Sequence, residues 1–313
     1  MKISNILHSY WNGNYSVVVL NDGTKIRTTK ATEFIPDFAE NCDVKITDKC
    51  DGGCPFCYEG CTPKGEHAVL FDENNKPIQK WMTELHPGTE LALNGNDLSH
   101  PDLQKLLEYL KSKGIITNIT VNQKHFMQKA DILKKWCDDK LIYGLGVSLS
   151  DSADEKFYET LKDFPNAVIH TIVGILSYTD FYQMRNRGLK ILILGYKDLG
   201  RGTDYKKIAK DKLTYNIHWM KSEGLKEIMS SFKVVSFDNL ALEQLDVKKV
   251  LFEHREKGWK QFYMGDDGQF TFYIDAVKQQ YAKDSCVPVN ERKSSTGLTV
   301  DQMFSDIRKY SNI

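Results

Sequence analysis

Short apolar segments alternate with helical patterns between about residues 43 and 200, and this alternation limits the possible folds more than any other feature. Six apolar segments are expected to be strands: residues 43–47, 90–93, 116–121, 141–148, 167–173 and 189–194. Amphipathic segments lie between them; within residues 101–110, four leucines recur at the spacing of one helix face. Strands separated by helices form βαβ units, so the sequence predicts an α/β fold with a parallel sheet.

The chain before and after this region has other patterns. Residues 15–20 and 24–28 flank Asn21-Asp22-Gly23, a turn sequence typical of β-hairpins. Beyond the alternating region we expect, in order, a polar helix over about 203–223, a strand over 232–237, a helix after Asp238, a hairpin pairing 261–264 with 269–274, and a final helix. The sequence thus predicts three parts: a β-rich preface (1–42), a core (43–202) and a C-terminal α/β extension packed on the core (203–313).

Five of the seven cysteines lie within residues 42–61. Cys50, Cys54 and Cys57 follow the first expected strand at the spacing C-x3-C-x2-C, and two intervening glycines let the backbone turn tightly. An odd number of cysteines without a secretion signal is a poor match for a disulfide framework. Three thiolates converging on one centre suit a [4Fe–4S] cluster that leaves one iron open for another ligand.

This segment resembles the radical S-adenosylmethionine (radical SAM) enzymes, whose motif is C-x3-C-x-aromatic-C; Phe56 supplies the aromatic residue. The resemblance covers about residues 40–200 and implies a partial (β/α)6 barrel. It implies that Cys50, Cys54 and Cys57 hold a [4Fe–4S] cluster, whose open iron binds S-adenosylmethionine with Phe56 near the adenine. It also implies reductive cleavage of S-adenosylmethionine to a 5′-deoxyadenosyl radical that abstracts hydrogen from a substrate. A flavodoxin or ferredoxin would supply the electron.

The resemblance further implies contacts to S-adenosylmethionine at the ends of the later strands: Asn94, Gly95, Asn96, Ser148, Gly174, Gly195 and Tyr196. The first three occupy the place of the family's Gly-Gly-Glu-type segment, which contacts the methionine amino group, although the residues themselves differ. Ser148 takes the position of a ribose or carboxylate contact. The remaining three correspond to backbone that approaches the adenine.

Other polar residues at the expected strand ends are candidates for substrate contacts. Asn122, Gln123 and His170 follow from position alone, and His170 is equally well explained as a satisfied core residue. Lys197 and Arg201 lie in a glycine-rich segment and are candidates for cradling a carboxylate or phosphate. The alternative for that segment is an exit loop with solvated charges.

Two further interpretations of the sequence remain open. The cysteines would suit a structural zinc site if Cys61, Cys42 or His67 supplied a fourth ligand, which would make the chain a non-catalytic scaffold. Within the enzyme class, a peptide is one candidate substrate, and a nucleoside, a nucleic-acid base or a small metabolite is the alternative. The 42 basic residues equal the 42 acidic ones, so a protein that mainly coats nucleic acid is disfavoured.

The sequence also bears on the cellular compartment. It contains no apolar stretch of about 18 residues, the length that a membrane span requires. Residues 1–10 lack the long apolar region of a secretion signal. We therefore expect a cytoplasmic protein without a membrane segment.

Overall fold

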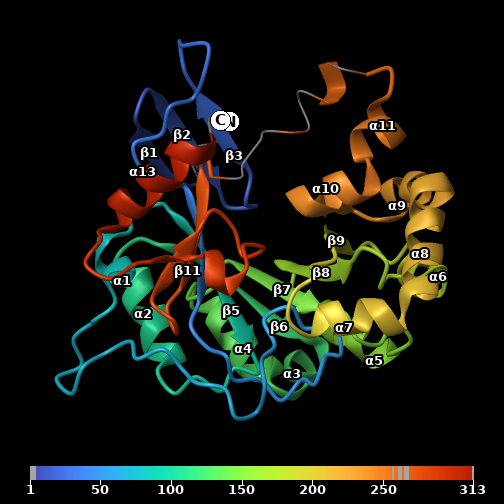
Figure 1. Cartoon of the computed structure of the whole chain (residues 1–313), viewed down its shortest axis with the longest axis horizontal. Helices are drawn as coiled ribbons and strands as arrows, with labels where there is room; N and C mark the ends of the chain where they lie inside the picture. Colours follow the sequence, from blue (N-terminus) through green and yellow to red (C-terminus); the bar gives the residue numbers. More distant parts are fainter. Residues whose placement is uncertain (1–4, 256, 260–262, 264–267, 312–313) are drawn as a thin grey trace.

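A ten-stranded mixed sheet is the largest element of the structure, a computed structural model that describes residues 5–255, 257–259, 263 and 268–311. Its strand order is β10-β9-β8-β7-β6-β5-β4-β11-β12-β13 (Figure 1). The strands are β4 (Asn41–Lys45), β5 (Glu90–Asn96), β6 (Ile116–Asn122), β7 (Gly144–Ser148), β8 (Ala167–Ile172), β9 (Lys190–Leu194), β10 (Val234–Phe237), β11 (Thr271–Asp275), β12 (Gln280–Ala282) and β13 (Lys293–Ser294). All pairs from β10 to β11 are parallel, and β12 and β13 are antiparallel additions.

The six strands expected between residues 43 and 200 are β4 to β9, so the predicted α/β fold with a large parallel sheet is confirmed. The strand expected over 141–148 begins only at Gly144. Leu141 and Ile142 instead close the preceding helix, because their backbone N–H groups donate to the carbonyl of Trp136. Both side chains are buried in the core, which explains their apolar character.

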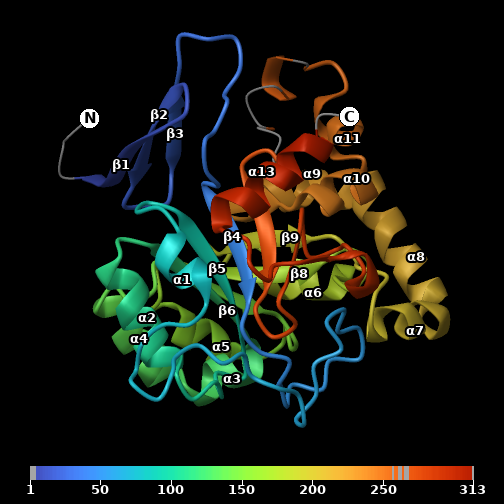
Figure 2. The same ribbon diagram turned by 60° about the vertical axis from the view of Figure 1, so that its left-hand side comes forward.

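Helices cover one face of the sheet (Figure 2). They are α1 (Lys80–Glu84), α2 (Leu103–Ser112), α3 (Gln123–Gln128), α4 (Ala130–Asp138), α5 (Glu155–Leu161) and α6 (Tyr178–Met184). The four leucines of α2 are buried against alternate residues of the strands, such as Leu91 and Leu93 of β5. The residues that alternate with them along the strands point to the other face of the sheet, where Asp43 and Ala92, for example, are exposed. The two faces of the sheet therefore separate the packed core from a polar side.

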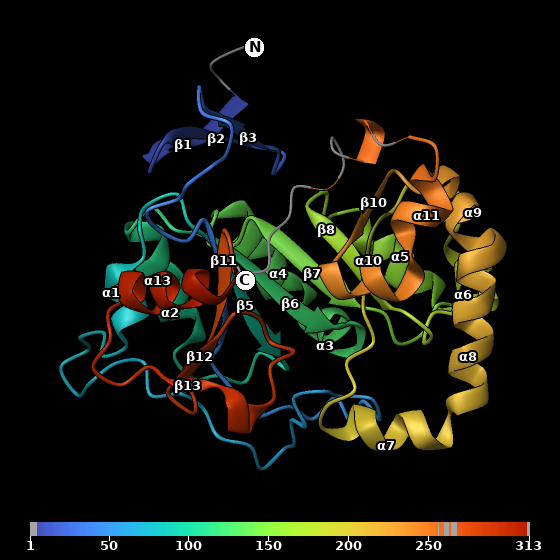
Figure 3. The same cartoon turned by 45° about the horizontal axis from the view of Figure 1, so that its top comes forward.

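The chain after β9 contributes a helical layer and then returns to the sheet. The polar helix expected over 203–223 appears as α7 (Arg201–Ile208), α8 (Lys210–Trp219) and a π-helical turn (Met220–Gly224) that leads into α9 (Leu225–Ser231). Figure 3 shows these helices along one side of the molecule. β10 then pairs with β9 as the expected strand, and α10 (Asn239–Leu245) and α11 (Val247–Phe252) follow it.

The last part of the chain adds strands at the opposite edge of the sheet. The first half of the hairpin expected over 261–274 lies largely outside the described residues. Its second half is β11, which pairs with β4 in parallel and with β12 in an antiparallel hairpin. A short 3-10 turn (Val289–Glu291) precedes β13, and α13 (Val300–Ser311) ends the described chain. The segments after β9 thus extend the sheet at both of its edges.

The first strands form a separate three-stranded sheet, with β1 (Ile6–Asn12), β2 (Tyr15–Leu20) and β3 (Lys25–Thr28) in sequence order. The hairpin expected around Asn21-Asp22-Gly23 is β2 and β3. Buried Glu40 connects this sheet to the start of β4: it accepts a hydrogen bond from Tyr15 and pairs with Arg27 at 2.9 Å. Among the described helices, none has both the length and the apolar character needed to cross a membrane.

Candidate functional site

The loop of residues 50–61, here called the cysteine loop, lies beyond the carboxyl end of β4, the edge at which open α/β sheets bind ligands. Arg201 at the start of α7 holds this loop. Its Nε donates to the carbonyl of Cys54 at 3.1 Å, its Nη1 donates to the carbonyl of Cys61 at 2.8 Å, and its backbone N–H donates to the carbonyl of Cys57. The sequence predicted a carboxylate or phosphate cradle for Arg201, but the structure commits its guanidinium to the loop.

The first two thiols of the cysteine loop lie on either side of Gly52. A Cβ placed on that glycine would lie 3.2 Å from Sγ of Cys50 and 3.9 Å from Sγ of Cys54. Gly53 has a φ of +65°, which glycine adopts readily. The positive φ of Gly53 agrees with the tight turn expected of this glycine pair, and both sulfurs lie within 4 Å of the Cβ position of Gly52.

The third thiol, Cys57, lies close to the thiol of Cys61. This neighbour lowers the pKa of Cys57, whereas burial raises the pKa values of Cys50 and Cys54. Cys61 also accepts a 3.5 Å hydrogen bond from Nδ2 of Asn96. Cys61 is therefore a direct neighbour of the motif.

The donor set of the loop fits an iron–sulfur cluster. All seven cysteines of the chain are free thiols, and those at 50, 54 and 57 are half-buried on one loop. Thiolates are the ligands that such clusters prefer. In residues 5–255, 257–259, 263 and 268–311, no three Cys, His, Asp or Glu side chains already stand together in the arrangement of a metal site.

The three side chains considered as a fourth zinc ligand lie in different surroundings. Cys42 is buried in the helix-covered core. His67 bonds Oγ1 of Thr47 through Nδ1 at 2.8 Å. Of the three, Cys61 is the one close enough to a motif cysteine, Cys57, to shift its pKa.

Asn94 and Asn96 support the segment that leads into the cysteine loop. Asn94 accepts from the backbone N–H of Ile46 at 2.7 Å and donates to the carbonyl of Thr47 at 2.9 Å, and Asn96 donates to the carbonyl of Lys49 at 2.9 Å. Gly95 lies between them because a Cβ there would lie 2.6 Å from the carbonyl oxygen of Thr120. These side chains bond this protein's own backbone.

A pocket opens beside the cysteine loop and collects several of the predicted residues. Its lining includes Cys54, Phe56, Asn122, Ser148, His170 and Leu194. Cys54 also accepts a hydrogen bond from Nδ2 of Asn122 at 3.7 Å. Gln123, in contrast, is buried and bonds the backbone of Ser150 and Asp151, so its role is structural.

Three residues predicted to contact S-adenosylmethionine, Gly174, Gly195 and Tyr196, do not line this pocket. Backbone groups of all three already bond other residues of the chain. The carbonyl of Gly174 accepts from Asn216 at 2.7 Å. The N–H of Gly195 donates to Asp238 at 2.8 Å. Both backbone polar groups of Tyr196 bond the side chain of Gln244. The helix α10 thus covers the end of β9.

His170 is the most distinctive polar group of the pocket. A Cβ on Gly146 would lie 2.6 Å from Nε2 of His170 and 2.7 Å from Oγ1 of Thr120, so the glycine makes room for the ring. Burial lowers the pKa of His170 to about 4, which keeps the imidazole neutral at neutral pH. No side chain within the described parts of the chain hydrogen-bonds the ring of His170.

A lysine lies on the other side of the cysteine loop. Nζ of Lys197 donates to Oγ of Ser285 at 2.8 Å and stands 4.0 Å from the ring centre of Tyr58. The side chain of the nearby Asp43 keeps exposed surface, but the protein around it removes part of its hydration and raises its pKa to about 6, and the charge of Lys197 works against that rise. Both basic residues predicted to cradle an anion thus contact the cysteine loop: Arg201 through backbone carbonyls, and Lys197 through the ring of Tyr58.

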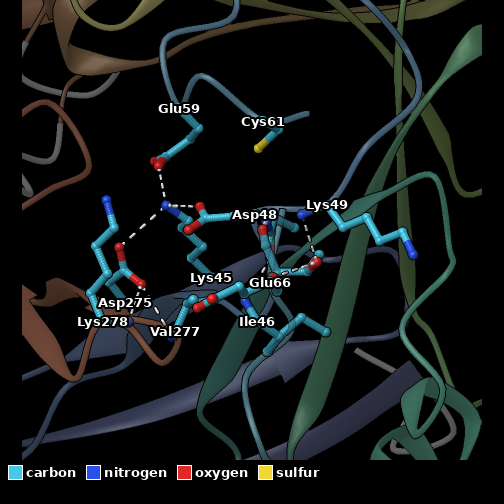
Figure 4. Close-up of polar contacts among 12 residues, drawn as sticks. Lys45, Ile46, Asp48, Lys49, Glu59, Cys61, Glu66, Asp275, Val277 and Lys278 are labelled. Carbon is cyan, nitrogen blue, oxygen red and sulfur yellow. Dashed lines mark hydrogen bonds and ion pairs between the residues drawn. The ribbon is translucent and has the colours of Figure 1, made fainter. Parts of the chain in front are cut away.

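Sequence reasoning missed two groups of charged residues around the loop. Asp51, next to Cys50, pairs with the buried His125 of α3. On the opposite side, Lys45 pairs with Asp48, Glu59 and Asp275 at 2.5, 2.6 and 3.3 Å (Figure 4). Burial disfavours the charged form of Lys45, but these carboxylates outweigh it and raise its pKa above the ordinary value. A lysine inside an expected strand was the only signal of this group in the sequence.

Known proteins provide a fold comparison. No protein-family model matches the sequence, and no curated protein is significantly similar to it. Among solved structures, Streptococcus suis SuiB bound to S-adenosylmethionine matches with a TM-score of 0.57 at 12% identity, over 98% of this chain and 89% of that one. SuiB bound to the precursor peptide SuiA matches with a TM-score of 0.52 at 15% identity, over 88% of this chain and 67% of that one. The chain therefore shares its fold with SuiB.

Proposed function

We propose that this protein is a radical SAM enzyme. The observation that carries the proposal is the position of the three-thiol loop, beyond the carboxyl end of β4 and next to a pocket lined by the carboxyl-end residues of neighbouring strands. The shared fold with a protein crystallised with S-adenosylmethionine supports it. Under this proposal, β4 to β9 with their helices are the partial (β/α)6 barrel of residues 43–202.

Cys50, Cys54 and Cys57 would hold a [4Fe–4S] cluster. When bound and reduced, the cluster supplies the electron that cleaves S-adenosylmethionine, which starts radical chemistry on a substrate. Phe56 and Ser148 line the pocket where the cosubstrate would lie, and Cys54 reaches the same space. Asn94, Gly95 and Asn96 would act mainly by fixing the backbone before the loop.

We propose a peptide as the substrate class, because SuiB was crystallised with its precursor peptide SuiA on the same fold. The neutral net charge of the chain agrees with a substrate other than long nucleic acid. His170 and Asn122 face the pocket and are the residues we expect nearest the substrate.

Metal analysis tests the proposal. Anaerobic reconstitution of the full chain with iron and sulfide should give about four of each per chain. A variant with Cys50, Cys54 and Cys57 replaced by serine should bind neither, and the exposed-lysine variant Lys162→Gln should match the wild type. Stoichiometric zinc without sulfide would instead indicate a structural scaffold that uses Cys61 as a fourth ligand.

A further inference from the structure

A buried network of charges connects the cysteine loop to parts of the chain far away in the sequence. Lys45 lies at the end of β4, Glu59 in the cysteine loop, Asp275 at the end of β11, and Arg292 just before β13. The side chains of Lys45, Asp275 and Arg292 are at most 2% exposed, and that of Glu59 is 11% exposed. Figure 4 shows Lys45 between the carboxylates of Glu59, Asp48 and Asp275.

The C-terminal segment closes the network. Arg292 pairs with Asp275 at 3.1 Å and approaches Glu59 at 4.0 Å. Tyr273 of β11 donates to Oε1 of Glu59 at 3.3 Å and accepts from Arg292 at 3.2 Å. Glu59 therefore contacts β4 through one oxygen and the C-terminal strand through the other.

The placement of Glu59 in the chain gives this network a consequence for the site. Glu59 lies between Cys57 and Cys61 in the sequence, and the turn that they form is closed by the N–H of Gly60, which donates to the carbonyl of Cys57 at 3.2 Å. Arg201 holds the backbone of the same turn from the other side, through the carbonyls of Cys57 and Cys61. The Glu59 carboxylate thus provides a charged side-chain anchor for the turn that carries the third motif cysteine.

We propose that Glu59 is a positioning residue, and that its ion pair with Lys45, braced by Tyr273, Asp275 and Arg292, fixes the Cys57–Cys61 turn in place. The C-terminal extension is then part of the metal-binding site, although the three proposed cysteine ligands all lie outside it. The role in metal binding rests on the proposed function, but the anchoring of the Cys57–Cys61 turn can be measured on the metal-free chain.

The charge balance makes Glu59→Gln the informative variant. The network contains two cations, Lys45 and Arg292, and three carboxylates, those of Asp48, Glu59 and Asp275. Removing the Glu59 charge leaves two of each sign, so the fold should persist. Removing Lys45 would leave three carboxylates facing one arginine, which is far more disruptive.

Hydrogen exchange on the metal-free chain tests the anchoring. In Glu59→Gln, amides of residues 54–62 should exchange about tenfold faster than in wild type, while β5 to β8 keep their protection. Glu66→Gln is the matched control, because Glu66 is an exposed residue in the segment between β4 and α1 that also contains Glu59. Its side chain has no ion pair among the described residues. Equal exchange of the turn in wild type, Glu59→Gln and Glu66→Gln would overturn the proposal.

A second readout concerns the loaded protein. If the turn sets the position of Cys57, the electron paramagnetic resonance spectrum of the reduced cluster should change in Glu59→Gln, and Glu59→Asp should restore part of the wild-type spectrum. Tyr273→Phe removes only a hydroxyl and keeps every charge, so it should change the spectrum less than Glu59→Gln does. If the Glu59→Gln protein does not fold, Tyr273→Phe is the variant to measure in its place. Unchanged spectra in all three variants would also overturn the proposal. Wild type that binds no cluster would refute the proposed function, and the exchange experiment would still decide the anchoring.

Discussion

His170 carries a prediction about stability as a function of pH. Its pKa is about 4 in the folded chain and about 6.5 when unfolded, because burial disfavours the charged ring. Between these pH values the unfolded chain binds more protons than the folded chain does. The stability that comes from keeping His170 neutral in the fold is therefore fully present above pH 6.5 and is lost as the pH falls toward 4. From pH 7 to pH 5, the linkage relation gives a loss of about 2 kcal/mol in the free energy of unfolding. Because the ring keeps some surface open to the pocket, we expect about 1–2 kcal/mol.

Urea unfolding at pH 7 and pH 5 measures this loss for wild type and for His170→Asn. The variant has no imidazole at this position, so its stability should fall by about 1–2 kcal/mol less than that of wild type between the two pH values. His218→Asn, at an exposed position of α8, serves as the control and should behave as wild type. The reasoning is refuted if wild type and His170→Asn lose the same stability.

Three further substitutions have expected outcomes. Gly146→Ala places a methyl group against the ring of His170 and should destabilise the chain by about 1–3 kcal/mol; an unchanged urea midpoint would contradict the packing. Asp43→Asn should stabilise the chain at pH 7.5 and have little effect at pH 4, because the raised pKa of about 6 makes the folded state lose stability as the pH rises through that value. Arg201→Gln should lower the amount of iron bound per chain, because the guanidinium bonds two carbonyls of the cysteine loop. Lys206→Gln, which removes an exposed ion pair with Asp198, should leave the iron content unchanged. Equal iron content in the two variants would show that the bonds of Arg201 are dispensable.

The sheet could be predicted from the sequence because its signals are local. Each of β4 to β9 is a short apolar run between turn residues, and the periodicity of each run does not depend on its partners. The start of β7 was placed too early, because Leu141 and Ile142 are apolar for a different reason: they close α4 and fill the core. The position of β11 beside β4 joins residues more than 200 apart, and no local pattern encodes such a pairing.

In the candidate site, too, features encoded locally could be predicted and features that depend on distant partners could not. The cysteine spacing indicated which loop to consider as a site, and the two glycines within it indicated a tight turn, with which the φ of +65° at Gly53 agrees. It did not predict the supports of the loop, because Arg201, Glu59 and Lys45 act through partners that only the folded chain brings near. Arg201 illustrates the limit: its glycine-rich surroundings suggested an anion site, but its hydrogen bonds go to backbone carbonyls of the cysteine loop.

The formation of 5′-deoxyadenosine tests the central claim most directly. Full-length protein is reconstituted anaerobically, reduced with dithionite and incubated with S-adenosylmethionine, and the nucleoside product is quantified by mass spectrometry. We predict 5′-deoxyadenosine and methionine in equal amounts from wild type and none from Cys54→Ala. A wild-type protein that carries about four irons and four sulfides per chain, yet forms no 5′-deoxyadenosine, would contradict the claim that this chain is a radical SAM enzyme.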